Sequence, residues 1–137
     1  LDKAIELNPE DGIIWCNKGR TLGEIGRYEE ALESLDKAIE LNPEDGVIWN
    51  NKGLTHYKLG DINGAREAFL KSLDKESKYN KRGIELCYMV QTRLRFLGEK
   101  NIGNRLLDTM GSGIIDESEA RKIRKTAYQK TLKMIKK

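Results

Sequence analysis

Residues 1–12 read LDKAIELNPEDG, and residues 35–46 repeat those twelve letters without a single difference. When each of residues 1–34 is compared with the residue 34 positions later, 21 of the 34 pairs are identical. A fixed short period indicates stacked supersecondary units rather than one globular core. We therefore expect a repeat solenoid, an architecture that mostly serves to bind other molecules.

Each unit contains two stretches of apolar residues at helical spacing, residues 14–25 and 28–39 in the first copy. Gly26 separates them, where a left-handed residue ends the first helix. The segment Asn42-Pro43-Glu44-Asp45 is expected to stop the second helix and start the next, with Asn42 as a cap and the carboxylates at the positive helix end. The pattern predicts an all-α fold of helix pairs in which the small residues Gly19 and Ala31 allow close crossing.

These letters resemble the tetratricopeptide repeat, a 34-residue helix-turn-helix unit. The first unit supplies the recurring residues Trp15, Gly19, Gly26, Tyr28, Ala31, Leu35, Ala38 and Pro43, and the second supplies Trp49, Gly53, Tyr57, Gly60, Ala65 and Phe69. The second unit departs from the pattern at two positions, where Ser72 replaces the expected Ala and Ser77 the expected Pro. The resemblance implies a right-handed superhelix of antiparallel helix pairs.

The register divides the chain into a solenoid, residues 1–110, and a C-terminal part, residues 111–137. Because Gly98 stands 38 residues after Gly60, a degenerate third repeat with four extra residues is expected. The solenoid thus comprises a half repeat, two full repeats and this longer one, at residues 1–9, 10–43, 44–77 and 78–110. The chain begins in mid-repeat and is read as a fragment, so Leu1–Leu7 are expected to fray or self-associate.

The C-terminal part is predicted to be a linker and one amphipathic helix that starts at Asp116-x-x-Glu119, a capping-box-like pair. Its inward side would carry Ala120, Ile123, Ala127, Tyr128, Thr131, Leu132, Met134 and Ile135, and its outward side Lys122, Lys125, Lys130, Lys133 and Lys137. We expect this helix to cap the solenoid, with docking of a lipid, nucleic acid or protein as the alternative.

The sequence offers no catalytic constellation, so a non-catalytic protein without cofactor or metal is expected. His56 is the only histidine, and no nucleophile elbow, Walker loop or paired Cys-x-x-Cys motif occurs. Cys16 and Cys87 have no metal-ligand spacing and are expected to be buried, reduced thiols, which suits a cytoplasmic chain. No apolar run approaches the roughly 20 residues of a membrane span.

The resemblance implies a concave groove lined by the first helix of each repeat, which would bind a peptide or partner segment. The matching positions are Asn17, Arg20, Glu24, Asn50, Asn51, Leu54, Tyr57 and Lys58, with Tyr88, Thr92 and Arg95 from the third unit. This mixed lining suits an acidic or amphipathic peptide. The asparagines could hold a peptide backbone or simply be tolerated surface residues. Of the carboxylate clamp known in some members only Asn51 is kept, so no such clamp is expected.

Charge is unevenly distributed and supports two alternative functions. Residues 1–46 hold 5 basic and 12 acidic side chains, a net charge of −7, whereas residues 47–137 hold 20 and 10, a net charge of +10. The basic half could bind nucleic acid or another anionic surface. Nucleic acid is disfavoured because acidic residues intervene up to Glu119 and the aromatic residues fall inside helices. A third alternative is an assembly segment of a larger enzyme.

Overall fold

A computed structural model describes residues 2–75, 81–98 and 116–136, and every element in these ranges is an α-helix. The helices are α1 (Asp2–Leu7), α2 (Gly12–Glu24), α3 (Tyr28–Leu41), α4 (Gly46–Lys58), α5 (Ile62–Lys75), α6 (Lys81–Phe96) and α8 (Glu117–Lys136). The all-α prediction is thereby confirmed. The chain divides into two compact units, Leu1–Lys75 and Glu76–Lys137, which are described separately.

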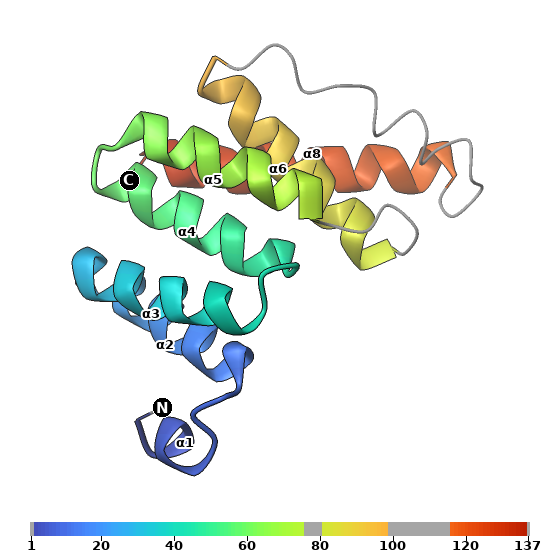
Figure 1. The fold of residues 1–137 in the computed structure, drawn as a ribbon. Helices are drawn as coiled ribbons and strands as arrows, with labels where there is room; N and C mark the ends of the chain where they lie inside the picture. Colours follow the sequence, from blue (N-terminus) through green and yellow to red (C-terminus); the bar gives the residue numbers. More distant parts are fainter. Residues whose placement is uncertain (1, 76–80, 99–115, 137) are drawn as a thin grey trace. The chain divides into compact units, whose positions relative to one another are not determined.

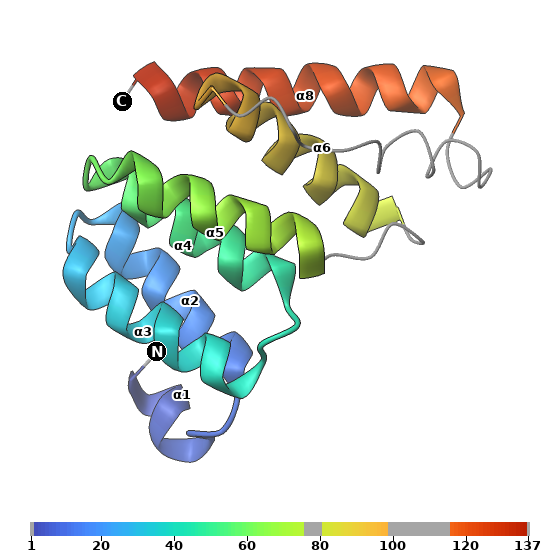
Figure 2. The same ribbon diagram turned by 45° about the horizontal axis from the view of Figure 1, so that its top comes forward.

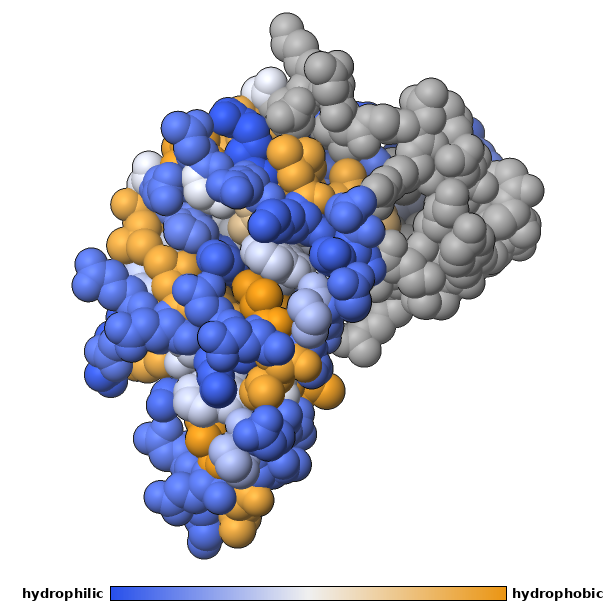
Figure 3. Space-filling model, viewed as in Figure 1, coloured by the Kyte–Doolittle hydropathy of each residue, from blue (hydrophilic) through white to orange (hydrophobic). Residues whose placement is uncertain are grey.

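The first unit consists of two antiparallel helix pairs, α2 with α3 and α4 with α5, and the short helix α1 (Figures 1 and 2). α3 also packs against α4, and α1 packs against α2. The predicted pairing of helices is thus confirmed for residues 12–75. Figure 3 shows hydrophobic residues at the surface at the bottom of the view, where Figure 1 places α1.

Glycine ends the first helix of each pair in a left-handed conformation. The φ angles of Gly26, Gly60 and Gly98 are +86°, +85° and +87°, a region that residues with a Cβ rarely adopt. Gly98 thus shares the turn conformation of the other two glycines, and the register of a third repeat stays a prediction. The second helix expected for that third repeat lies in residues 99–115, outside the described residues.

The helix starts in the connector differ from the expected ones. Asp11 and Asp45 are the N-caps of α2 and α4, because the carboxylate of each accepts a hydrogen bond of 2.9 Å from the backbone nitrogen two residues later. Asn42 instead terminates α3 as its C-cap. The expectation that Asn42 caps the next helix was wrong, since the two turn residues Pro43 and Glu44 separate Asn42 from α4 and leave Asp45 next to its first turn.

Small residues set the distance within each pair. A Cβ atom on Gly19 would lie 2.6 Å from Cγ of Leu35, and one on Gly53 would lie 2.5 Å from the Phe69 ring. Ala31 is fully buried, as expected for a residue at the crossing. Ser72, one of the departures from the repeat pattern, is also fully buried, and its hydroxyl donates a 2.6 Å hydrogen bond to the Gly46 carbonyl. That bond offsets the cost of burying a hydroxyl where alanine was expected.

In the second unit α6 packs against α8, and Tyr88, Ala120 and Ala127 form its core cluster. Four residues of α6 at helical spacing are buried: Leu86, Cys87, Val90 and Leu94. Asp116 caps α8 as predicted, because its Oδ1 accepts a 2.8 Å hydrogen bond from the backbone nitrogen of Glu119. Whether α8 also caps the solenoid stays a prediction.

Two residues of α8 do not lie where the amphipathic pattern placed them. Tyr128 and Ile135 are 51% and 38% exposed, whereas Ala120, Ala127, Thr131 and Met134 are buried as expected. The apolar letters of α8 spread over about half of the helix circumference, and the covered arc is narrower than that. The outward lysines Lys122, Lys125, Lys130 and Lys133 are exposed as expected, and Lys137 lies outside the described residues.

Candidate functional site

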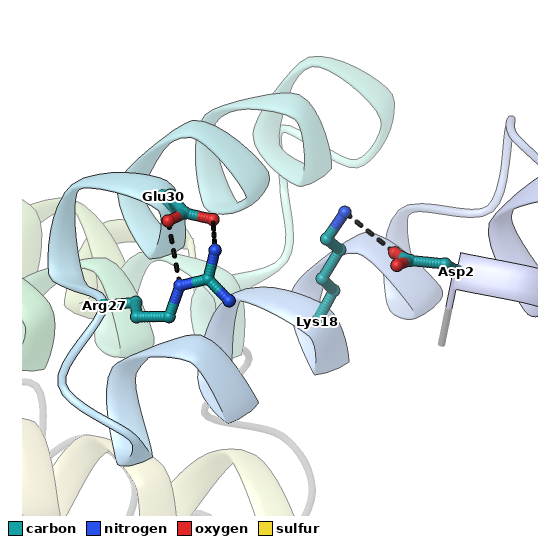
Figure 4. A network of polar contacts seen from close by, with 4 residues as sticks. All are labelled: Asp2, Lys18, Arg27 and Glu30. Carbon is teal, nitrogen blue, oxygen red and sulfur yellow. Dashed lines mark hydrogen bonds and ion pairs between the residues drawn. The ribbon is translucent and has the colours of Figure 1, made fainter.

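Several charged residues of the first unit are engaged in joining neighbouring repeats. Lys18 Nζ lies 3.0 Å from Asp2 Oδ1 (Figure 4), and Lys52 Nζ lies 2.8 Å from Asp36 Oδ1. Each pair links the first helix of a repeat to the helix before it. The hydrogen bond and charge of Lys18 lower the pKa of Asp2. Each of these charges therefore has a partner across a boundary between repeats.

The same two lysines lie over the tryptophans of their repeats. Nζ of Lys18 is 5.7 Å from the Trp15 ring centroid, and Nζ of Lys52 is 5.4 Å from that of Trp49. The indole nitrogens donate to the carbonyls of Pro9 and Pro43, at 2.9 and 3.2 Å. Each tryptophan therefore links its own helix to the connector that precedes it.

The predicted groove residues of α2 and α4 occupy equivalent helical rows. Asn17, Arg20 and Glu24 are spaced i, i+3 and i+7 in α2, and Asn51, Leu54 and Lys58 repeat this spacing 34 residues later in α4. Arg20, Glu24 and Lys58 are exposed, and the other members are half-buried, as is Tyr57 beside the second row. We call these seven residues the variable face: Asn17, Arg20, Glu24, Asn51, Leu54, Tyr57 and Lys58.

The two rows lie on neighbouring helices that touch directly. Nδ2 of Asn51 in α4 donates a 3.3 Å hydrogen bond to Sγ of Cys16 in α2. Further along, a Cβ atom on Gly23 would be 3.6 Å from the Thr55 hydroxyl oxygen. The Gly23 position thus lies at van der Waals distance from α4, and the two rows of the variable face stand on helices that contact each other.

Cys16, beside the variable face, is buried, whereas three residues of the face carry exposed charges. Burial raises the pKa of the Cys16 thiol above its ordinary value of 9.0, and the hydrogen bond from Asn51 opposes that rise. Arg20, Glu24 and Lys58 form no ion pair with any residue in the described ranges. The exposed charges of the variable face are therefore uncommitted, in contrast to those that join the repeats.

The variable face does not include the remaining predicted groove residues. Asn50 is only 5% exposed, although its neighbour Asn51 is accessible. Tyr88, Thr92 and Arg95 belong to the second unit, where Tyr88 is 3% exposed and its ring packs against Ala120 and Ala127. Thr92 donates a 2.8 Å hydrogen bond to the Tyr88 carbonyl, and Arg95 is exposed.

His56 and the cysteines form no chemical site in the described part of the chain. Nδ1 of His56 lies 3.1 Å from Oδ2 of Asp61 without hydrogen-bond geometry, and that carboxylate also caps α5 by accepting from the nitrogen of Gly64. Cys16 and Cys87 form no disulfide bond, and both are buried. Within residues 2–75, 81–98 and 116–136 no three His, Cys, Asp or Glu side chains are grouped as metal ligands.

One feature of the second unit was not anticipated from the sequence. The rings of Phe96 and Tyr128 contact each other with their centroids 5.7 Å apart, and both are about half exposed. Spacing gives no signal for this pair, because the two residues come from different helices and the amphipathic pattern places Tyr128 on the buried side.

Comparison with known protein families matches three repeat models to the first unit. One, described as TPR repeat, covers residues 19–60, and two described as Tetratricopeptide repeat cover residues 1–33 and 47–74. The chain belongs to the tetratricopeptide repeat (TPR) family. The three TPR matches extend through residues 1–74, the part in which the paired helices and turn glycines follow the 34-residue period.

TPR units generally serve protein–protein interaction, and the three matched models are repeat models rather than models of an enzyme family. No curated protein matches this TPR chain. Among the described helices, none combines the length and the apolar character that crossing a membrane requires.

Proposed function

We propose that this TPR protein is a non-catalytic interaction module whose variable face binds an extended or amphipathic segment of a partner protein. The observation that carries this proposal is that Arg20, Glu24 and Lys58, on the contacting helices α2 and α4, are exposed and form no ion pair with any described residue. Exposed charges next to apolar side chains can make binding specific for a peptide that carries complementary groups.

The distribution of sequence differences between the repeats supports the same surface. The identical letters lie mainly in connectors and at packing positions, for example Trp15 and Trp49 or Gly19 and Gly53. The differing pairs include positions on or beside the variable face: Cys16/Asn50, Arg20/Leu54, Gly23/Tyr57 and Glu24/Lys58. Residues at these positions can differ between repeats without disrupting the packing of the helices, as a surface adapted to one ligand requires.

The chemistry of the face favours an acidic segment with some apolar residues. Arg20 and Lys58 present two cations against the single carboxylate of Glu24, and Leu54 and Tyr57 add partly exposed apolar surface. The Asn17 amide supplies both a donor and an acceptor for a peptide backbone. Extended segments are commonly recognised by such alternation of backbone and side-chain contacts.

Selection of peptides on the 137-residue chain tests the proposal. Peptides chosen from a random library would be measured by calorimetry against the wild type, Arg20→Ala/Asn51→Ala and Arg20→Glu/Lys58→Glu. We expect acidic, partly apolar peptides whose affinity falls at least about tenfold in both variants, equivalent to about 1.4 kcal/mol.

The matched control is Lys3→Glu/Lys71→Glu, which makes the same change of charge at exposed residues of α1 and α5. This control should bind the selected peptides like the wild type. Selected peptides that bind all variants equally would place the binding site elsewhere on the molecule.

A further inference from the structure

The outward side of α8 is strongly basic. Residues 120–136 hold seven basic side chains and no acidic one. Arg121 and Arg124 are partly neutralised, since both approach Oε1 of Glu117, at 3.5 and 2.9 Å. The other five have no carboxylate partner among the described residues and are all exposed: Lys122, Lys125, Lys130, Lys133 and Lys136.

These five lysines form a row along the helix. At 100° per residue they fall within an arc of about 140°, opposite Ala120 and Ala127, which pack on Tyr88. From Lys122 to Lys136 the row extends about 21 Å at 1.5 Å per residue. A row of unpaired cations of this length attracts a linear polyanion more strongly than it attracts a single anion.

An exposed aromatic pair borders the row. Tyr128 is 51% exposed and Phe96 is 43% exposed, with an angle of 49° between their rings. Tyr128 stands one helical turn after Lys125, so the phenol ring and the ammonium group lie on adjacent parts of the surface. Rings left open beside unpaired lysines provide stacking surface next to phosphate-binding groups.

We propose that this surface binds single-stranded nucleic acid, independently of the peptide-binding function proposed for the first unit. The phosphates would follow the lysine row, and an unpaired base would stack on Tyr128. A duplex would make poor use of the aromatic pair, because its bases are already paired and stacked. We call the lysine row together with Phe96 and Tyr128 the basic face.

A membrane fits the basic face less well. Amphipathic helices that bind bilayers insert their apolar side among the lipids. In α8 the apolar side is occupied, since Ala120 and Ala127 are fully or almost fully buried in the unit. An acidic peptide would satisfy the lysines but would have no need of the open rings.

Fluorescence anisotropy with labelled single strands of about fifteen nucleotides tests the proposal. Oligothymidylate would be compared with an abasic deoxyribose-phosphate strand of equal length over a series of salt concentrations. We expect oligothymidylate to bind more tightly than the abasic strand. The logarithm of its binding constant should fall with the logarithm of salt concentration with a slope of about −2 to −3.5, from three to five phosphate contacts.

Two variants separate the roles of the rings and the lysines. Tyr128→Ala should weaken oligothymidylate binding about tenfold and leave the abasic strand unaffected, whereas Tyr128→Phe should retain both affinities. Lys122→Gln/Lys125→Gln should weaken both strands and reduce the magnitude of the salt slope by about 1.4. Lys3→Gln/Lys71→Gln is the matched control in the first unit and should behave like the wild type.

Three results would overturn the proposal. Equal affinity for the two strands combined with no effect of Tyr128→Ala would show attraction to any polyanion. Binding to phosphatidylserine vesicles without binding to oligothymidylate would identify a membrane surface. Displacement of oligothymidylate by an equal charge concentration of polyglutamate would identify an acidic protein segment. Circular dichroism of each variant would show that its helices are retained.

Discussion

Nζ of Lys52 in α4 lies 2.8 Å from Oδ1 of Asp36 in α3, across the boundary between two repeats. The equivalent contact one period earlier joins Lys18 of α2 to Asp2 of α1 at 3.0 Å. The 34-residue period is therefore a period of interfaces as well as of helices. Each ion pair also lies beside a tryptophan whose indole nitrogen donates a hydrogen bond to the connector of the same repeat.

A double-mutant cycle on Asp36 and Lys52 should give a small coupling energy. The side chains are 58% and 23% exposed, so water and salt screen the pair, and we expect a coupling of about 0.2–1 kcal/mol to the free energy of unfolding. Urea unfolding of Asp36→Ala, Lys52→Ala and the double variant measures it. The coupling should decrease in high salt, and a value insensitive to salt would contradict this account.

Gly53→Ala should destabilise the first unit by about 1–3 kcal/mol, because the added Cβ would lie 2.5 Å from the fully buried Phe69 ring. Chemical denaturation monitored by tryptophan fluorescence provides the measurement. Thr21→Ala, at an exposed position of α2, is the control and should change the unfolding free energy by less than about 0.5 kcal/mol. An equally stable Gly53→Ala protein would show that α4 and α5 can move apart without cost.

Cys16 should make the stability of the first unit depend on pH in the alkaline range. Burial raises the pKa of its thiol above 9.0, so above that pH the folded chain holds a proton that the unfolded chain has lost. The unfolding free energy should therefore decrease as pH rises through about 9 towards the folded pKa, and Cys16→Ala should reduce this decrease. Equilibrium unfolding of both proteins between pH 7.5 and about 10 checks the sign.

Self-association through α1 is expected from the exposure of its apolar residues. Leu7 is 79% exposed, and nothing in α1 is fully buried. Light scattering at increasing protein concentration should show a rising mass for the wild type and a constant mass for Leu7→Lys. Slow hydrogen exchange in α1 of a strictly monomeric protein would contradict the expectation.

The sequence predicts the fold where spacing alone determines it. The turn at Gly98 follows from the register of Gly26 and Gly60, and the start of α8 follows from Asp116 and Glu119. Local hydrogen bonding and backbone conformation decide these features. The assignment of the cap to Asn42 failed because two residues in the same short connector can both cap, and only the length of the turn chooses between them.

The candidate sites are determined more by which side chains pack beside one another than by the spacing of residues in the sequence. Alignment to the repeat located the rows of the variable face, but it could not show that Asn50 is buried while Asn51 bonds to Cys16. Likewise, the period of α8 indicated which half of the helix is apolar. Packing against α6 determines how much of that half is covered, and it leaves Tyr128 exposed.

The identity of α1 with the last six residues of α3 has a consequence for protein engineering. Residues 2–7 and 36–41 have the same letters, and each segment offers the next helix the same aspartate. An in-frame duplication of residues 35–68 would thus create a boundary whose contacts already exist in the chain. Because nearest-neighbour terms add in repeat arrays, the elongated protein should gain about one further increment of stability. The length of the array is then an adjustable parameter, and a longer ligand could be accommodated by copying rather than by redesign.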